Sequence, residues 1–273
     1  MKRWIDAGEV AAARTAGGHR RVSRREAVRF IRERGFPVAD LAALRLPELA
    51  GVPHADAAGP VTAEALIEAF RAGEAGRARA LIVAEYVRGE SVAELCDGLM
   101  RQTLHRVGKM WREHDRVEGI GVEHEVTDTF IYALGQIRSL VVLPGSDAPV
   151  AVGGAIAGDP YIIPSLMAAT VLEDLGFDVT NLGPDTPVEV LAETAQRRKA
   201  DLVWCSVSTE TSLKTLQQEG ERLMASVAEP RVRVIVGGRE AKEEVLPGLT
   251  VLPSMQALVT IARQVLAAGG GEA

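Results

Sequence analysis

The fold of the C-terminal half is decided by residues 149–182, which read PVAVGGAIAGDPYIIPSLMAATVLEDLGFDVTNL. An apolar run is followed by a turn containing Gly158 and Asp159, then by a stretch with helical spacing, then by a second apolar run. Continuous apolar runs separated by helical segments are typical of a parallel sheet that is covered on both faces. This stretch therefore predicts a βαβ unit.

The same alternation continues to the end of the chain. It predicts strands at 149–156, 177–182, 202–207, 232–236 and 249–252, and helices at 162–175, 187–198, 212–227 and 255–267. Five strands connected largely by helices predict an α/β fold with a doubly wound, flavodoxin-like, five-stranded parallel sheet. Folds of this type bind ligands at the carboxyl ends of their strands.

The chain divides into four parts by composition. We expect a basic segment at 1–36, a linker rich in Ala, Leu and Pro at 37–60, a helical bundle at 61–145 and the α/β domain at 146–273. In the bundle, Ser91 and Glu94 have the spacing of a capping box, and a second box is expected at Ser23 and Glu26. The glycines at 119–121 are expected to break the bundle helix.

Composition excludes several classes of protein. Of 273 residues, 47% are hydrophobic and 25% are charged, which argues against disorder. Cys96 and Cys205 are too few and too far apart for a disulfide framework, and we interpret them as buried apolar residues. No apolar run is long enough to span a membrane and no signal peptide opens the chain, so we expect a cytoplasmic location. No phosphate loop, nucleophile elbow or His-Glu-x-x-His motif occurs, so we expect no enzyme activity.

The charge is unevenly distributed. Residues 1–35 contain ten Lys or Arg and four Asp or Glu, for a net charge of +6, whereas the whole chain carries −6. A basic segment on an acidic body suggests that the segment alone binds a polyanion. A solvated basic terminus is the alternative.

The basic segment resembles the wing of MerR-type winged helix-turn-helix regulators. The resemblance is carried by Trp4, by Gly8 and by the run from Arg14 to Arg21, which reads RTAGGHRR. It implies that DNA phosphates or the minor groove are contacted by Arg14, Thr15, Gly17, Gly18, His19, Arg20 and Arg21. Contacts of this kind give salt-dependent affinity and little sequence discrimination.

In that family a helix and the start of the recognition helix precede the tryptophan, whereas here only Met1, Lys2 and Arg3 do. Base edges are read from that helix. Two explanations remain open: the start codon has been placed too far downstream, or the chain has lost its major-groove reader.

The basic wing, bundle and α/β domain together resemble CarH/LitR regulators, light-responsive proteins that hold adenosylcobalamin between the two body domains. By this resemblance, Trp111 and the pair Glu123-His124 would cover the upper face of the corrin ring. His124 is the candidate metal ligand. A buried core tryptophan and a surface Glu-His pair are the alternatives.

Cobalamin domains of this kind place Asp-x-His-x-x-Gly after the first strand, with the histidine coordinating cobalt from below. Here Asp159 matches, but Tyr161 stands in place of the histidine and Pro164 in place of the glycine. The resemblance assigns the nucleotide-tail pocket to Ser206, Ser208, Thr209, Gly237 and Gly238. A phenol is mostly protonated at neutral pH and is a poorer metal donor than imidazole. We therefore expect Tyr161 to hydrogen-bond Asp159 or to fill the lower cleft.

Three interpretations of the body remain open. It binds cobalamin without a protein ligand below, it binds another tetrapyrrole such as haem or bilin with His105, His114 or His124 as axial donor, or it is a ligand-free scaffold. The main hypothesis is a DNA-binding transcriptional regulator, a repressor, that forms a homo-oligomer (dimer or tetramer) with a cobalamin-type sensor. The other hypothesis is a corrinoid carrier protein of a methyltransferase system; Tyr161 and the basic wing count against it.

Overall fold

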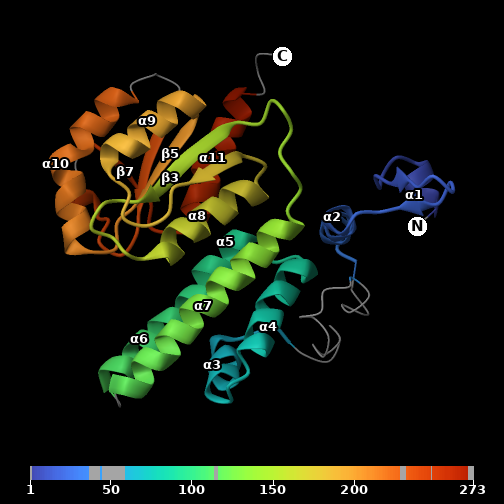
Figure 1. The fold of residues 1–273 in the computed structure, drawn as a ribbon, viewed down its shortest axis with the longest axis horizontal. Helices are drawn as coiled ribbons and strands as arrows, with labels where there is room; N and C mark the ends of the chain where they lie inside the picture. Colours follow the sequence, from blue (N-terminus) through green and yellow to red (C-terminus); the bar gives the residue numbers. More distant parts are fainter. Residues whose placement is uncertain are drawn as a thin grey trace. The chain divides into compact units, whose positions relative to one another are not determined.

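The computed structural model describes residues 2–36, 44, 59–113, 116–227, 232–246 and 248–269. The chain forms two compact units, Met1–Val142 and Leu143–Ala273, and each is described by itself. Figure 1 shows the helical first unit in blue to green and the α/β second unit in green to red.

The second unit contains a five-stranded parallel sheet of order β4-β3-β5-β6-β7. Its strands are β3 (Val150–Ala155), β4 (Asp178–Asn181), β5 (Leu202–Ser206), β6 (Arg233–Gly237) and β7 (Thr250–Val251). Its helices are α8 (Ile162–Asp174), α9 (Val188–Arg198), α10 (Glu210–Ser226) and α11 (Met255–Gly269), with a 3-10 turn at Glu243–Val245. The predicted fold and the order of its elements are confirmed.

Alternation along the strands divides the sheet into two buried faces. Val203 and Cys205 of β5 belong to the apolar core that is closed by Leu191 of α9 and Leu216 of α10. Because successive side chains of a strand point to opposite faces, Trp204 and Ser206 point to the other face. That face is covered by α8, which packs against α11.

The first unit contains a helical bundle. Its elements are α3 (Ala63–Arg71), α4 (Ala75–Arg88), α5 (Val92–Leu95), the π-helical segment η4 (Cys96–Met100), α6 (Arg101–Glu113) and α7 (Arg116–Leu140). The predicted capping box is present: Ser91 Oγ accepts from Glu94 N at 3.2 Å, and Glu94 Oε2 accepts from Ser91 N at 2.9 Å. The predicted break at 119–121 is wrong, because α7 runs through both glycines. Packing of α7 against α4 and α6 outweighs the cost of about 1 kcal/mol per helical glycine.

The basic segment folds as α1 (Lys2–Asp6), a two-stranded antiparallel hairpin of β1 (Ala13–Arg14) and β2 (Arg20–Arg21), and α2 (Arg24–Arg34). Trp4 packs on Phe30 of α2, with ring centroids 5.0 Å apart. The second capping box is only half formed. Ser23 Oγ accepts from Glu26 N at 3.2 Å, but the Glu26 carboxylate accepts instead from Ala11 N at 2.7 Å and pairs with Arg29.

Two arginines of α2 contact the carboxyl ends of bundle helices. Arg25 Nε donates to the carbonyl of Ser139, near the end of α7, at 2.8 Å. Arg32 donates to the carbonyl of Tyr86 in the last turn of α4 and to that of Glu90 just after the helix, and its guanidinium carbon lies 3.7 Å from the centre of the Tyr86 ring. Terminal carbonyls of a helix carry partial negative charge, so these are favourable sites for cations.

The predicted linker at 37–60 lies almost entirely outside the described residues. Within the ranges that the structure describes, no helix combines the length and apolar character that a bilayer crossing requires.

Candidate functional site

Asp159 joins two loops at the carboxyl edge of the sheet. Its side chain is fully buried, with Oδ1 accepting from the amide of Tyr161 at 3.0 Å and Oδ2 accepting from the amide of Ser208 at 2.6 Å. The first amide belongs to the turn after β3 and the second to the turn after β5. A buried carboxylate is stable where charge-assisted hydrogen bonds satisfy it. Asp159 therefore fixes the geometry of the edge without any ligand.

Neighbouring residues reinforce this connection. Gly158 N donates to Asp185 Oδ1 at 2.7 Å, and Thr209 Oγ1 donates to the carbonyl of Gly158 at 2.8 Å. Thr209 is also the N-cap of α10. Asp185 adopts a positive φ of 53°, a conformation that Asp tolerates better than most residues. Three strand–helix turns are thus hydrogen-bonded to one another.

Tyr161 does not fill the crevice. Its side chain is 44% exposed, and the hydrogen bond to Asp159 is made by its backbone amide, so the expectation of a phenol in the lower cleft is wrong. The Arg239 guanidinium carbon lies 5.7 Å from the centre of the Tyr161 ring, and Arg239 Nη2 donates to the carbonyl of Ser208 at 2.6 Å. An arginine and a tyrosine thus lie together at the outer rim of the edge.

Two serines at the same edge carry unused hydrogen-bonding capacity. Ser206 and Ser208 are each 4% exposed, and within the described part of the chain their Oγ atoms have no hydrogen-bond partner. A buried hydroxyl without a partner costs free energy, which makes it a candidate for contact with a ligand or an ordered water.

The predicted glycine pair has unequal roles. Gly238 has a φ of 121°, and a Cβ there would overlap the carbonyl group of Val207 and lie 2.8 Å from Val207 N. A Cβ on Gly237 would lie 3.8 Å from its nearest neighbour, the Leu252 carbonyl oxygen. Gly238 is therefore required by the protein's own backbone, whereas a Cβ on Gly237, the register partner of Ser206, would fit in ordinary van der Waals contact.

The candidate residues of the bundle belong to the other unit. Trp111 is in α6, and Glu123 and His124 are in α7, where Glu123 is half-buried and His124 exposed. His105 is also in α6, whereas His114 lies outside the described residues. No cluster of three or more potential metal-ligating side chains occurs among the described residues. The role of these residues above a corrin ring stays a prediction.

The hairpin presents most of its predicted DNA-contacting residues to solvent. Arg14 is the register partner of Arg20 across β1 and β2. Gly17, Gly18, His19 and Arg21 are also exposed, whereas Thr15 is half-buried. Arg20 forms an ion pair with Asp6 at 2.5 Å. The turn has the hydrogen bonds Thr15 N to His19 O at 2.9 Å and Gly18 N to Thr15 O at 2.8 Å.

Several charges of the basic segment are engaged inside the protein. Arg29 pairs with both Glu26 and Glu33, an arrangement that lowers the pKa of Glu26 and raises that of Arg29. Arg25 and Arg32 contact helix ends, as described above. Exposed basic residues remain on the hairpin (Arg14, Arg20 and Arg21) and also outside it (Lys2, Arg3, Arg24 and Arg34).

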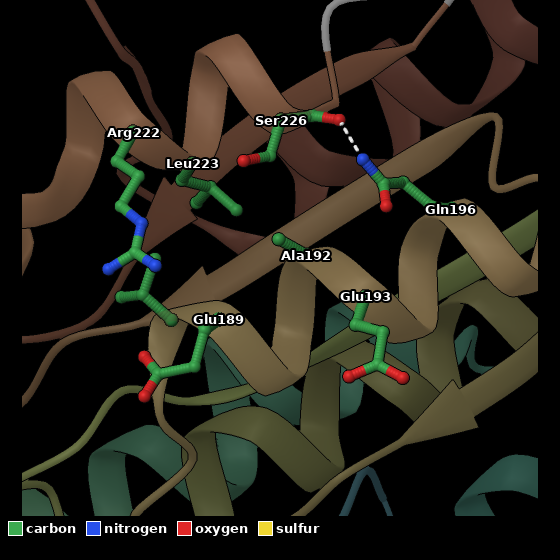
Figure 2. Close-up of a pocket in the computed structure, with 8 residues that line it drawn as sticks. Glu189, Ala192, Glu193, Gln196, Arg222, Leu223 and Ser226 are labelled. Carbon is green, nitrogen blue, oxygen red and sulfur yellow. Dashed lines mark hydrogen bonds between the residues drawn. The ribbon is translucent and has the colours of Figure 1, made fainter.

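A separate hollow of about 130 Å³ lies between α9 and α10 (Figure 2). Gln196 Nε2 donates to the carbonyl of Ser226 at 2.5 Å across it, and Glu189, Glu193 and Arg222 lie around its rim. Sites for small organic ligands are typically about 300–1,000 Å³, so this hollow is too small for a tetrapyrrole.

Comparison with known families identifies the type of the second unit. Residues 149–251 match the B12 binding domain family. The match extends from β3 to β7 and includes Asp159, Ser206 and Gly238. It confirms the sequence-based prediction that the α/β domain is of the cobalamin-binding type.

Relatives and solved structures agree with this match. The dimethylamine corrinoid protein of Methanosarcina barkeri is 31% identical over 99 residues, which are 36% of this chain and 46% of the relative. Dimethylamine corrinoid protein 3 of Methanosarcina acetivorans is 32% identical over 94 residues, 34% of this chain and 44% of the relative. The chain thus spans less than half the length of these relatives. The structure of the Methanosarcina barkeri monomethylamine corrinoid protein has the same fold, with a TM-score of 0.58 and 16% identity over 73% of this chain and 96% of that one.

These comparisons favour the carrier-protein hypothesis over the regulator hypothesis, because the relatives are named as corrinoid proteins and the matches give no support to a MerR-type, DNA-binding or light-sensing role. They also leave the individual site residues as predictions. Arg239 and Trp204 were missed by sequence reasoning, because only the folded chain brings them to Tyr161 and Gly153.

Proposed function

We propose that this chain is a corrinoid-binding protein whose α/β domain holds the ligand at the carboxyl edge of the sheet. One observation carries the proposal: two buried hydroxyls without partners, Ser206 and Ser208, lie at that edge in a domain of the cobalamin-binding type. Gly237, the register partner of Ser206, is not required by the packing of the chain itself. A bound corrinoid would supply a cobalt centre that can bind and release a further ligand.

The lower face of the cobalt would lack a protein imidazole. No histidine follows His124 in the sequence, and the Tyr161 ring lies at the rim beside Arg239. The residues of this domain therefore do not fit coordination of the cobalt from below by a protein imidazole. A lower histidine paired with an aspartate tunes the metal in a protein that cycles its oxidation state. Here the aspartate is occupied by two backbone amides.

The lack of a histidine in the α/β domain that could coordinate the cobalt favours a regulator over a methyl carrier. In the regulator, ligand binding controls assembly into a dimer or tetramer, and the assembled hairpins, with Arg14, Arg20 and Arg21 exposed, bind the DNA backbone together. The protein is then a sensor and not an enzyme. The carrier role is the second candidate, and the names of the relatives support it.

Corrinoid binding is tested by gel filtration in the dark with adenosylcobalamin, followed by the absorbance spectrum of the protein peak. We expect a co-eluting corrin spectrum, with binding by S206A/S208A at least about tenfold weaker, since two hydrogen bonds are lost. S226A, on α10 away from the edge, is the control and should bind as wild type. A wild-type protein without corrin refutes the proposal, and a haem or bilin spectrum after expression with those pigments selects another tetrapyrrole.

The regulator and carrier roles are separated by DNA binding. We expect a band shift with promoter DNA that R20A/R21A weakens strongly, and the salt dependence of the remaining affinity should be weaker by about two counterions in that variant. K214A/R222A removes two exposed charges from α10 and should leave the shift unchanged. Methyl transfer to the bound corrinoid by a methyltransferase, without any band shift, would support the carrier role.

A further inference from the structure

The side chain of Trp204 fills the space between the sheet and α8 next to the candidate site. This residue is 3% exposed and lies two positions before Ser206 on β5, so both side chains point to the face covered by α8. Its indole Nε1 donates to Ser165 Oγ of α8 at 3.2 Å, and Ser165 Oγ donates to Asn181 Oδ1 at 2.8 Å. The indole is therefore fixed in place by a chain of hydrogen bonds.

The neighbouring strand is shaped to receive this ring. Gly153 of β3 is the register partner of Trp204, and a Cβ on Gly153 would overlap Cδ2 and Cε2 of the indole. The ring thus lies directly against the backbone of β3. The indole of Trp204, which is a bicyclic aromatic ring, therefore fills the volume between β3, β5 and α8.

This arrangement bears on how a corrinoid is held. Cobalamin carries a nucleotide tail that ends in a bicyclic benzimidazole, which either coordinates cobalt from below or leaves the cobalt and extends into the protein. The tail pocket predicted from the sequence lies at Ser206 and Gly237, which are register partners on the same face as Trp204. Two residues further into the strand, the space for an extended base is closed by the indole of Trp204.

A second observation agrees with the first. When the benzimidazole leaves the cobalt, another donor has to take its place for the metal to keep a lower nitrogen ligand. The α/β domain contains no histidine, and the Tyr161 ring is at the outer rim. The domain therefore offers neither the slot for a displaced base nor the imidazole that would replace it.

We propose that this domain recognises the corrin ring alone and that Trp204 excludes the nucleotide tail, so that cobalamin binds with its own benzimidazole still on the cobalt. This inference depends on the proposed corrinoid function. It predicts that cobinamide, a corrinoid without the nucleotide base, binds as well as cobalamin does.

The test uses the full chain with cob(II)alamin and cob(II)inamide, by binding titration and electron paramagnetic resonance. We expect dissociation constants within about threefold of each other, nitrogen splitting of the cobalt signal with cobalamin, and no such splitting with cobinamide. Loss of the splitting on binding of cobalamin, or cobinamide affinity more than tenfold weaker, overturns the inference while leaving the corrinoid function intact. Nitrogen splitting with cobinamide identifies a protein imidazole and also overturns it. If neither corrinoid binds, the proposed function fails as well.

Substitution of the indole gives an independent readout. W204A removes the ring from the slot, and we expect it to favour cobalamin over cobinamide by at least tenfold and to weaken the nitrogen splitting of bound cobalamin. W204F keeps an aromatic side chain if the alanine variant does not fold, and a smaller shift in the same direction is expected. S165A removes the hydrogen bond to the indole but leaves the ring, and it should behave as wild type. A W204A protein that folds and keeps the wild-type ratio and spectrum refutes the role of Trp204.

Discussion

Replacing Asp159 by alanine should destabilise the α/β unit even with no ligand present. The substitution leaves the buried amide of Ser208 and the half-buried amide of Tyr161 without their acceptor. Hydrogen bonds to a charged group contribute about 1.5–3 kcal/mol each, and the more exposed one contributes less, so we expect a loss of about 3 kcal/mol. For a unit of this size the melting temperature should fall by about 10 °C.

The assay is urea unfolding followed by the fluorescence of Trp204 in a W4F/W111F background, because the other two tryptophans belong to the first unit. D178N is the control: Asp178 is an exposed carboxylate paired with Arg198 at 2.9 Å, and exposed pairs contribute about 0–1 kcal/mol. A D159A protein within about 1 kcal/mol of wild type would show that the carboxylate does not hold the loops together. The burial of the Asp159 carboxylate would then have to be explained by contact with a ligand.

Three further predictions follow from single residues. Alanine at Gly238 should cost at least about 2 kcal/mol more than alanine at Gly176 in the same assay, because both have positive φ but only at 238 would the Cβ overlap backbone; equal losses would contradict this. Burial raises the pKa of Cys205 to about 12 and that of Cys96 further, so neither thiol should react with a disulfide reagent at pH 8 before unfolding, and rapid labelling of the native protein would contradict the structure. The hydrogen bond from Arg29 lowers the pKa of Glu26, so the Glu26 carboxylate stabilises the basic segment above the ordinary Glu pKa, and this stabilisation is lost as pH falls through the lowered pKa. Protection of the Ala11 amide from hydrogen exchange should disappear in that pH range. The E26Q variant should lack this transition.

The strands of the sheet could be predicted to within one or two residues because each is a continuous apolar run between turns. The prediction at 119–121 failed for a different reason. Local propensity disfavours glycine in a helix, but the tertiary contacts of α7 decide its course, and these are not visible in a short window of sequence.

For the candidate site, sequence reasoning identified the turns but not the contacts between them. Asp159 could be found by its motif, yet its acceptor role for Ser208 depends on a partner 49 residues away. Trp204 left one signal in the sequence, the glycine pair at 153–154 in a strand, which indicates a close approach by another group. The identity of that group follows only from the pairing of β3 with β5.

The attachment of α2 to two helix ends has a mechanical consequence. Arg25 is fastened to α7 and Arg32 to α4, so the helix that follows the hairpin spans two bundle helices at their termini. If α4 and α7 slide or tilt relative to one another, α2 has to turn with them or release one arginine. The hairpin that precedes α2 would then rotate with it, so a small displacement within the bundle would reorient the exposed arginines of the hairpin.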